Sequence, residues 1–334
     1  MNARPKVALI STGGTITSIS HVGELDMYEY TTSGNRLSAE QMLEKFPHAK
    51  TVADVIPVNF DRLPSTALGF EQWRKLVLTI EDLVRQHPDL AGVAILHGTA
   101  TIEETAYALN LTLKTDIPVV VTGAQRPASA VSTDAALNMY NAVRVAASPD
   151  ARGMGVLVCL NDEINAAREV TKTSTGRLQT FRTADFGALG HADGDRVAFY
   201  RRPLRRCAPD TPFDIRELAA FPRVDIAYSH ADSDGTAVRA FVAAGAKGIV
   251  GAAYVPGLLS PQESAAMKKA VDEGVVVVLS SRGGSGRVFG PAKTRDLGFL
   301  RADNLTPQKA RILLGLALTQ TSDPAQIQAM FDTY

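Results

Sequence analysis

The sequence predicts an α/β fold that is divided into two domains. The chain has 334 residues, of which 45% are hydrophobic, so it can bury more than one apolar core. Short, continuous, β-branched runs alternate with longer stretches that have helical spacing. This alternation indicates parallel strands that are buried on both faces and covered by helices.

The apolar runs set the expected order of elements. In the first part of the chain, buried strands are expected at 7–11, 92–96, 118–123 and 155–160, with helices at 70–86, 101–113 and 132–147. The pattern lapses between about 173 and 222, where Arg, Asp, Gly and Pro dominate, and strands return at 224–230, 248–254 and 275–281. A closing helix is expected at 306–320, with Thr306 as a good N-cap and Pro307 in its first position. We therefore expect a larger domain over 1–200, a linker over 201–222 and a smaller α/β domain over 223–334.

Composition excludes several classes of function. Lys+Arg and Asp+Glu both number 35, so the formal charge is zero and a nucleic-acid partner is not expected. The apolar run near the N-terminus is short, and no segment approaches a membrane span, so we expect a cytoplasmic protein. The two cysteines, Cys159 and Cys207, form neither a disulfide framework nor a metal pattern, and no His pair has metal-ligand spacing. No metal site is expected.

Three predicted strands end in polar, glycine-rich turns, at 11–17, 97–104 and 122–127. Ligands of parallel sheets bind outside the carboxyl ends of the strands, so we expect these turns to form one site. The first turn lacks the Lys of a phosphate-binding loop and the glycine spacing of a dinucleotide fingerprint. The glycines at 283–286 do not match a nucleophile elbow.

A threonine hydroxyl in such turns is a poor nucleophile until another group accepts its proton. A lysine neutralised by burial or a nearby phenol could accept it. Lys172, in the stretch EVTKTST, is flanked by hydroxyl side chains, although a lone lysine in a loop is more often a solvated charge. From the residues alone, the chain is an α/β enzyme with threonine-rich turns.

Six motifs, in order, resemble the bacterial L-asparaginase/glutaminase-asparaginase family: TGGTI (12–16), HGT-T-EETA (97–106), TGAQRP (122–127), NAV (141–143), VTKT (170–173) and NLTPQKARILLGLALTQT (304–321). The resemblance implies a two-domain α/β fold with a larger, mainly parallel N-terminal domain. It also implies a homotetramer of intimate dimers, with active sites at the dimer interface. The implied reaction is hydrolysis of a carboxamide through an acyl-threonine intermediate, without metal or cofactor.

The resemblance implies roles for individual residues. Thr15 matches the nucleophile, and Tyr30 matches the lid tyrosine that contacts it, with Tyr28 as an alternative. Thr99 matches the second catalytic threonine, and Lys172 matches the lysine beside it.

Main-chain groups complete the implied machinery. The main chain around Ala124 matches the carbonyl that holds the leaving amide nitrogen. The N–H groups of Thr99 and Thr15 would form the oxyanion hole, at helix N-termini where the dipole favours negative charge.

The sequence departs from the family where the substrate α-ammonium binds. The family Asp after the second threonine is Ala100 here, and the Gln that follows the carboxylate-binding Ser65 is Thr66. An Asn contributed by the partner subunit aligns with Leu258. The partner's acidic residue has no counterpart, because 283–295 contains no Asp or Glu.

These departures lead to our main hypothesis, an amidohydrolase for substrates without an α-ammonium, because an unpaired buried ammonium is destabilising. Short ω-amidic acids such as succinamate, and small apolar amides or lactams, fit this description. Without the aspartate, Lys172 should titrate at lower pH. One alternative is an L-asparaginase with a natural or engineered Asp-to-Ala change at position 100, and another is a non-catalytic binding protein. Gly23 and Gly34 suggest that 16–36 is a mobile gate.

Overall fold

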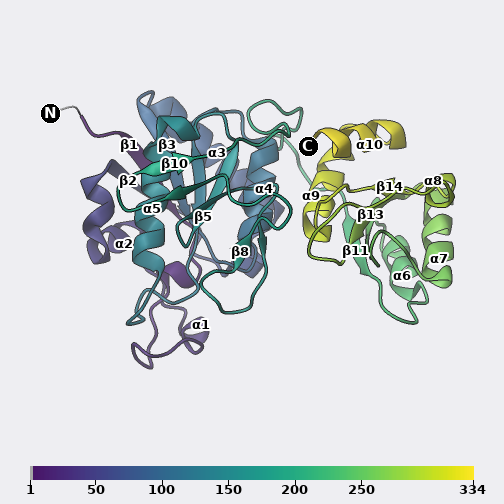
Figure 1. Cartoon of the computed structure of the whole chain (residues 1–334), viewed down its shortest axis with the longest axis horizontal. Coiled ribbons are helices and arrows are strands. Elements are labelled where there is room, and N and C mark those ends of the chain that lie inside the picture. The colour runs from purple at the N-terminus through teal and green to yellow at the C-terminus, as the bar shows by residue number, and fades with distance from the viewer. Residues whose placement is uncertain (1–2) are drawn as a thin grey trace. The chain divides into compact units, whose positions relative to one another are not determined.

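The computed structural model describes residues 3–334, which form two compact units that follow one another along the chain (Figure 1). The first unit extends to Thr211, and the second spans Pro212–Tyr334. The division falls within the range 201–222, which the sequence predicts to be a linker.

The first unit is built on an eight-stranded sheet in the order β10-β9-β6-β5-β4-β3-β1-β2. Its strands are β1 (Lys6–Ser11), β2 (Asp54–Asn59), β3 (Leu90–Leu96), β4 (Val119–Thr122), β5 (Val156–Leu160), β6 (Glu163–Ala166), β9 (Gly190–Ala192) and β10 (Val197–Phe199). The five strands β1 to β5 are parallel to one another, and β6, β9 and β10 join the sheet through antiparallel pairings, the first of them between β5 and β6. A separate two-stranded pair joins β7 (Thr171–Lys172) and β8 (Phe181–Arg182).

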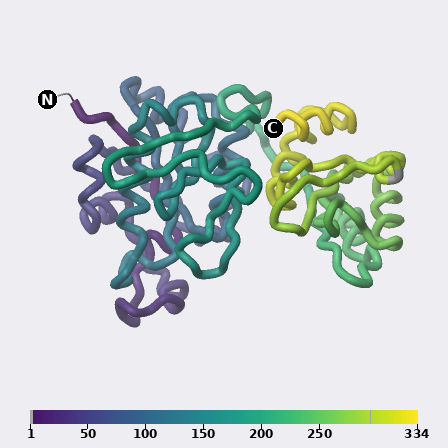
Figure 2. Tube along the Cα trace, in the orientation of Figure 1, coloured from purple at the N-terminus to yellow at the C-terminus, as the bar shows by residue number. Residues whose placement is uncertain are grey.

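Helices cover both faces of this sheet because alternate strand residues point to opposite sides. Leu9 and Leu96 belong to a core that includes Met42 of α2 (Ala39–Lys45) and Met139 of α5 (Ala135–Ala147). Helices α3 (Phe70–Gln86) and α4 (Ile102–Thr112) pack on the opposite face. The short helix α1 (Tyr30–Ser33) lies on a loop at the lower edge of the unit, purple in Figures 1 and 2.

The second unit has a four-stranded parallel sheet in the order β11-β12-β13-β14. The strands are β11 (Val224–Tyr228), β12 (Gly248–Ala253), β13 (Val276–Ser281) and β14 (Leu300–Arg301), and the helices are α6 (Thr236–Ala243), α7 (Pro261–Asp272), α8 (Ala292–Asp296), α9 (Pro307–Ala317) and α10 (Pro324–Thr333). Helices α6 and α7 share a core with one face of the sheet, and α9 packs against three of its strands. The predicted two-domain α/β class, with a mainly parallel sheet in the larger unit, is confirmed.

Two local expectations need correction. Thr306 is the N-cap of α9, but its side chain makes no capping hydrogen bond, and its buried Oγ1 has no partner among residues 3–334. Pro307 at the first position already removes one of the N–H groups that a cap would satisfy. The range 173–222 contains three short strands, β8, β9 and β10, which have too few residues to show a periodic pattern.

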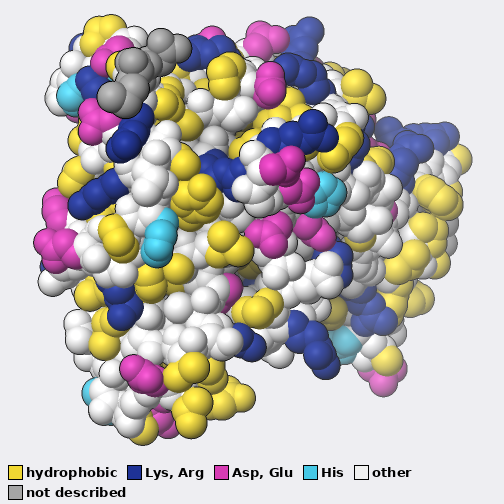
Figure 3. Space-filling view, turned by 60° about the vertical axis from the view of Figure 1, so that its left-hand side comes forward, with side chains coloured by type: hydrophobic (Ala, Val, Ile, Leu, Met, Phe, Trp, Pro, Cys, Tyr) yellow, Lys and Arg dark blue, Asp and Glu magenta, His cyan; other side chains and the backbone are white. Residues whose placement is uncertain are grey.

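The surface agrees with the balanced composition. On the face that Figure 3 shows, Lys and Arg side chains are dispersed among acidic and apolar ones. Within residues 3–334, none of the helices has the length and apolar character that crossing a lipid bilayer requires.

Helix α3 offers a matched test of the core. Leu76 is 0% exposed and Leu78 is 37% exposed. We expect Leu76→Ala to lower the free energy of unfolding by about 2–5 kcal/mol, because a buried cavity is left. Leu78→Ala should lower it by less than about 1 kcal/mol. Urea unfolding of both variants measures this, and equal losses would contradict the packing of α3 on the sheet.

Candidate active site

The turns after β1, β3 and β4 lie together at the carboxyl end of the first sheet, as the sequence predicts. These strands are neighbours in the order β4-β3-β1. The backbone N–H of Thr12 donates to the carbonyl of Leu96 at 3.0 Å, and its hydroxyl donates to the same oxygen at 2.9 Å. The N–H of His97 donates to the carbonyl of Thr122 at 2.8 Å. Hydrogen bonds between the strand ends therefore fix the turns relative to one another.

Glycine allows these turns to touch. Gly14 has a φ of 86°, which side chains rarely adopt, and a methyl group on it would lie 2.2 Å from Cα of Gly98. A methyl group on Gly98 would lie 2.6 Å from Oγ of Ser65. Three segments therefore meet with no room for a side chain between them.

A cleft of about 880 Å³ opens at this junction. Seven residues singled out from the sequence line it: Thr15, Tyr30, Ser65, Thr66, Thr99, Ala100 and Lys172. Ala124 is fully buried and its side chain is not in the lining, in keeping with a role predicted for the main chain only. Leu258 is 52% exposed in the second unit, so its predicted role, as a residue contributed by a partner subunit, stays a prediction.

Two side-chain pairs in the cleft have the geometry of proton transfer. The hydroxyl oxygens of Thr15 and Tyr30 are 3.1 Å apart. Tyr28, the alternative tyrosine, is 82% exposed and makes no such contact among the described residues. Nζ of Lys172 donates to Oγ1 of Thr99 at 2.9 Å. Each threonine therefore has its own partner.

The environment of Lys172 has two opposing effects on its charge. Burial lowers the pKa of Lys172, and the carboxylate of Glu103 acts in the opposite direction. Glu103 is 6% exposed; its Oε1 accepts a hydrogen bond from the N–H of Lys172 at 3.4 Å, and its Oε2 has no partner among residues 3–334. Nζ of Lys172 also donates to Oε1 of Gln125 at 3.4 Å. The lowered pKa has the direction that the sequence predicts, although Glu103 still supplies a counter-charge.

Asp26 holds the segment that carries Tyr30. Its carboxylate accepts hydrogen bonds from the hydroxyl of Ser20 at 2.5 Å and from the N–H groups of Tyr28, Glu29 and Tyr30, each at 2.9 Å. The bond from Ser20, followed by the backbone bonds, lowers the pKa of Asp26 to about 2 from 3.8. The charged form therefore keeps these bonds above about pH 4, and they are lost only as the pH falls towards 2.

Backbone donors are also free at the cleft. Thr15 begins the 3-10 helix Thr15–Thr17, and Thr99 lies just before α4. Within residues 3–334, neither N–H donates to a protein acceptor. Such donors at helix N-termini suit a developing oxyanion.

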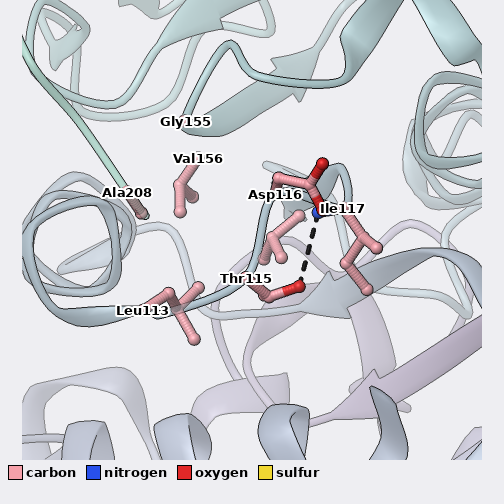
Figure 4. A pocket seen from close by; sticks show the side chains of 8 residues that line it. Leu113, Thr115, Asp116, Ile117, Gly155, Val156 and Ala208 are labelled. Carbon is pink, nitrogen blue, oxygen red and sulfur yellow. Dashed lines mark hydrogen bonds between the residues drawn. The ribbon is translucent and has the colours of Figure 1, made fainter. Parts of the chain in front are cut away.

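Other cavities lack this chemistry. A small cavity of about 10 Å³ lies at the amino end of the first sheet, where Val119 begins β4 and Val156 begins β5 (Figure 4). Its one drawn hydrogen bond joins the N–H of Ile117 to Oγ1 of Thr115 at 3.4 Å. Among residues 3–334, no three His, Cys, Asp or Glu side chains are arranged to hold a metal ion.

Comparison with known proteins shows which family carries this arrangement. The family description "Asparaginase, N-terminal" matches residues 6–205, and "Glutaminase/Asparaginase C-terminal domain" matches residues 223–331. The chain belongs to the asparaginase family. It is therefore an amidohydrolase, a hydrolase of non-peptide C–N bonds in linear amides.

Individual relatives match over almost the whole chain. The L-asparaginase 2 of Bacillus subtilis is 40% identical over 99% of this chain and 87% of its own length. A probable periplasmic L-asparaginase of Haemophilus influenzae is 38% identical over 99% of this chain and 93% of its own. The crystal structure of a probable cytoplasmic L-asparaginase from Campylobacter jejuni is 37% identical, covers 100% of both chains and superposes with a TM-score of 0.93.

Sequence reasoning missed three residues of this asparaginase-family site: Asp26, Glu103 and Gln125. The stretch Asp26–Glu29 does carry a signal, because Asp three positions before Glu is typical of a capped turn. Glu103 and Gln125 carry no comparable signal, since their contacts with Lys172 span 69 and 47 positions.

The hydrogen bonds of Asp26 can be tested by Asp26→Ala. We expect kcat for amide hydrolysis to fall roughly 10–100-fold, because Tyr30 is no longer positioned against Thr15. Ammonia release measures this. The exposed Glu24, in the same segment, provides a control in Glu24→Ala. Thermal unfolding should be unchanged in both, and equal activity of the two variants would contradict the positioning role.

Proposed function

We propose that the chain hydrolyses the terminal carboxamide of short ω-amidic acids through an acyl-enzyme on Thr15, and that it favours substrates without an α-ammonium. The observation that carries this proposal is the charge of the cleft lining. Within the described lining, Arg36 and Arg126 are cationic, Lys172 is the third basic side chain, and Glu29 is the one carboxylate. Such a cleft favours an anionic ligand over a zwitterion.

The acylation step uses the pair of Thr15 and Tyr30. Oγ1 of Thr15 attacks the amide carbonyl as its proton passes to the phenol oxygen of Tyr30 and the phenol gives up its own proton towards the amide nitrogen; the N–H groups of Thr15 and Thr99 hold the oxyanion. The proton then reaches the amide nitrogen, the C–N bond breaks and ammonia leaves. The acyl group remains as an ester on Thr15.

The deacylation step uses the pair of Thr99 and Lys172. A water molecule near Thr99 attacks the ester carbonyl, and neutral Lys172 accepts the water proton through the hydroxyl of Thr99. The ester bond breaks, Oγ1 of Thr15 regains the proton that Lys172 took up, and the dicarboxylic acid leaves. The lowered pKa of Lys172 supports this role, because a neutral amine is then more available near neutral pH.

Ala100 supports the substrate preference. It lines the cleft in the position where the family resemblance implies an Asp that binds the α-ammonium. A methyl group cannot accept a hydrogen bond from an ammonium, and losing a charged hydrogen bond corresponds to roughly 10–150-fold in affinity. Thr66, also in the lining, replaces a second ammonium ligand.

A second candidate is the hydrolysis of L-asparagine. Relatives at 38–40% identity are named as L-asparaginases, and Glu29 offers a carboxylate in the cleft lining that could pair with an α-ammonium. The two candidates share the same bond cleavage and differ only at the α-carbon.

Assembly and compartment also stay predictions. The family resemblance implies a homotetramer in which Leu258 of one subunit contributes to the cleft of another. The cytoplasmic location is supported by the description of the Campylobacter jejuni protein, whereas the Haemophilus influenzae relative is named as periplasmic.

Ammonia release from a panel of amides decides between the candidates. We expect kcat/KM for succinamate to exceed that for L-asparagine by at least roughly tenfold, with no release by Thr15→Ala. Ala100→Asp should reverse the preference, since it supplies a carboxylate. A wild-type preference for L-asparagine would establish the second candidate, and an active Thr15→Ala would refute the nucleophile.

The pH profile tests Lys172 as the base. If neutral Lys172 is required, the rate rises with pH as its ammonium loses a proton. Glu103→Gln removes the effect that raises the pKa of Lys172, so this limb of the profile should move to lower pH. Glu104→Gln, one position along α4, is the control. A limb that stays in place or moves to higher pH would contradict the assignment.

A further inference from the structure

Arg36 lines the cleft and lies at the end of segment 16–36, which the sequence predicts to be a mobile gate. Its backbone forms an antiparallel bridge with Ser18, and its carbonyl accepts a hydrogen bond from Nη1 of Arg62 at 3.0 Å. A methyl group on Gly13 would lie 3.3 Å from Cδ of Arg36, so the side chain crosses the turn that precedes Thr15. Arg36 is therefore held beside the nucleophile by its backbone.

The charged end of Arg36 is unpaired. Its Nε is buried and has no hydrogen-bond partner, and no ion pair within residues 3–334 includes this side chain. Native structures rarely leave a buried donor unsatisfied, so the buried Nε of Arg36 calls for an acceptor from outside the chain, and the charge of the guanidinium favours an anionic one.

The other basic side chains of the described lining already donate hydrogen bonds to the protein. Nη1 of Arg126 donates to the carbonyl of Ser132 at 2.6 Å, and Nζ of Lys172 donates to Thr99. The guanidinium of Arg36, in contrast, makes no hydrogen bond or ion pair with another described residue.

Arg36 also lies next to the segment that carries Ser65. The same methyl group on Gly13 would lie 2.9 Å from the carbonyl oxygen of Leu63, two residues before Ser65. Ser65 is 6% exposed and lines the cleft. An anion bound between Arg36 and Ser65 can accept a hydrogen bond from the serine hydroxyl and face the guanidinium.

We propose that Arg36 is the cationic anchor for the free carboxylate of the substrate; the identity of that substrate rests on the proposed function. An arginine can bind a carboxylate through two parallel hydrogen bonds, which fixes its orientation as well as its position. The anchor selects monoamides of dicarboxylic acids. Neutral amides and lactams suit the apolar part of the cleft at Ala100, but they lack the free carboxylate that Arg36 binds.

Calorimetric binding to the Thr15→Ala protein tests the anchor without turnover. The probes are succinate, succinamate and the uncharged succinamide. We expect a further Arg36→Gln change to weaken binding of succinate and succinamate by about tenfold or more, since a charge-assisted pair is lost. Succinamide binding should not change. Arg36→Lys should restore part of the affinity, because it keeps the positive charge but loses the two parallel N–H donors of the guanidinium.

Arg177→Gln on the same background is the control, since Arg177 is exposed beside the lining residues Thr175 and Gly176 and the charge change is the same. The anchor is overturned if succinate does not bind, if Arg36→Gln binds it as well as the parent does, or if succinamide loses as much affinity. Arg36-dependent binding of succinate by a protein that releases no ammonia from succinamate would refute the proposed substrate and keep the anchor.

Discussion

The contact between the backbones of Gly14 and Gly98 is the constraint on which the site depends. In the sheet, Ser11 at the end of β1 pairs with Leu96 at the end of β3, and the two turns leave the sheet side by side. They stay together because neither glycine carries a side chain; a methyl group on Gly14 would lie 2.2 Å from Cα of Gly98. Thr15 and Thr99 each follow one of these glycines directly, so the close approach of the backbones places both hydroxyls in one cleft.

The two threonines are supported in physically different ways. Thr99 follows a strand in the middle of the sheet and is 6% exposed, and its partner Lys172 is tied to α4 through the bond to Glu103. Thr15 has its partner Tyr30 on an exposed segment that is organised by the carboxylate of Asp26. On the proposed function, the buried pair of Thr99 and Lys172 activates water, and the exposed segment that carries Tyr30 opens to admit substrate.

Much of the fold could be predicted because fully buried parallel strands are continuous apolar runs; the predicted range 92–96 lies within β3, and the predicted helix 70–86 coincides with α3. The strand β2 gives a weaker signal, since it lies at the sheet edge and contains Pro57, which only an edge tolerates well. Site residues that follow strands, such as Thr15 and Thr99, could be placed by topology and family resemblance. Glu103 and Arg36 could not, because their roles depend on side-chain neighbours far away in the sequence.

The charges of the cleft lining bear on the kind of ligand that it binds. At position 100 the chain has a methyl group, and Glu103 is buried and accepts a hydrogen bond from the N–H of Lys172 rather than lining the cleft. The lining therefore keeps the cation of Arg36 without an acidic partner among the described residues. Apart from Glu29, an ammonium entering this cleft would meet basic side chains, whereas a carboxylate would supply the partner that Arg36 lacks. On the proposed function, the loss of one acidic side chain changes the preferred ligand from a zwitterion to an anion and leaves the two threonine pairs in place.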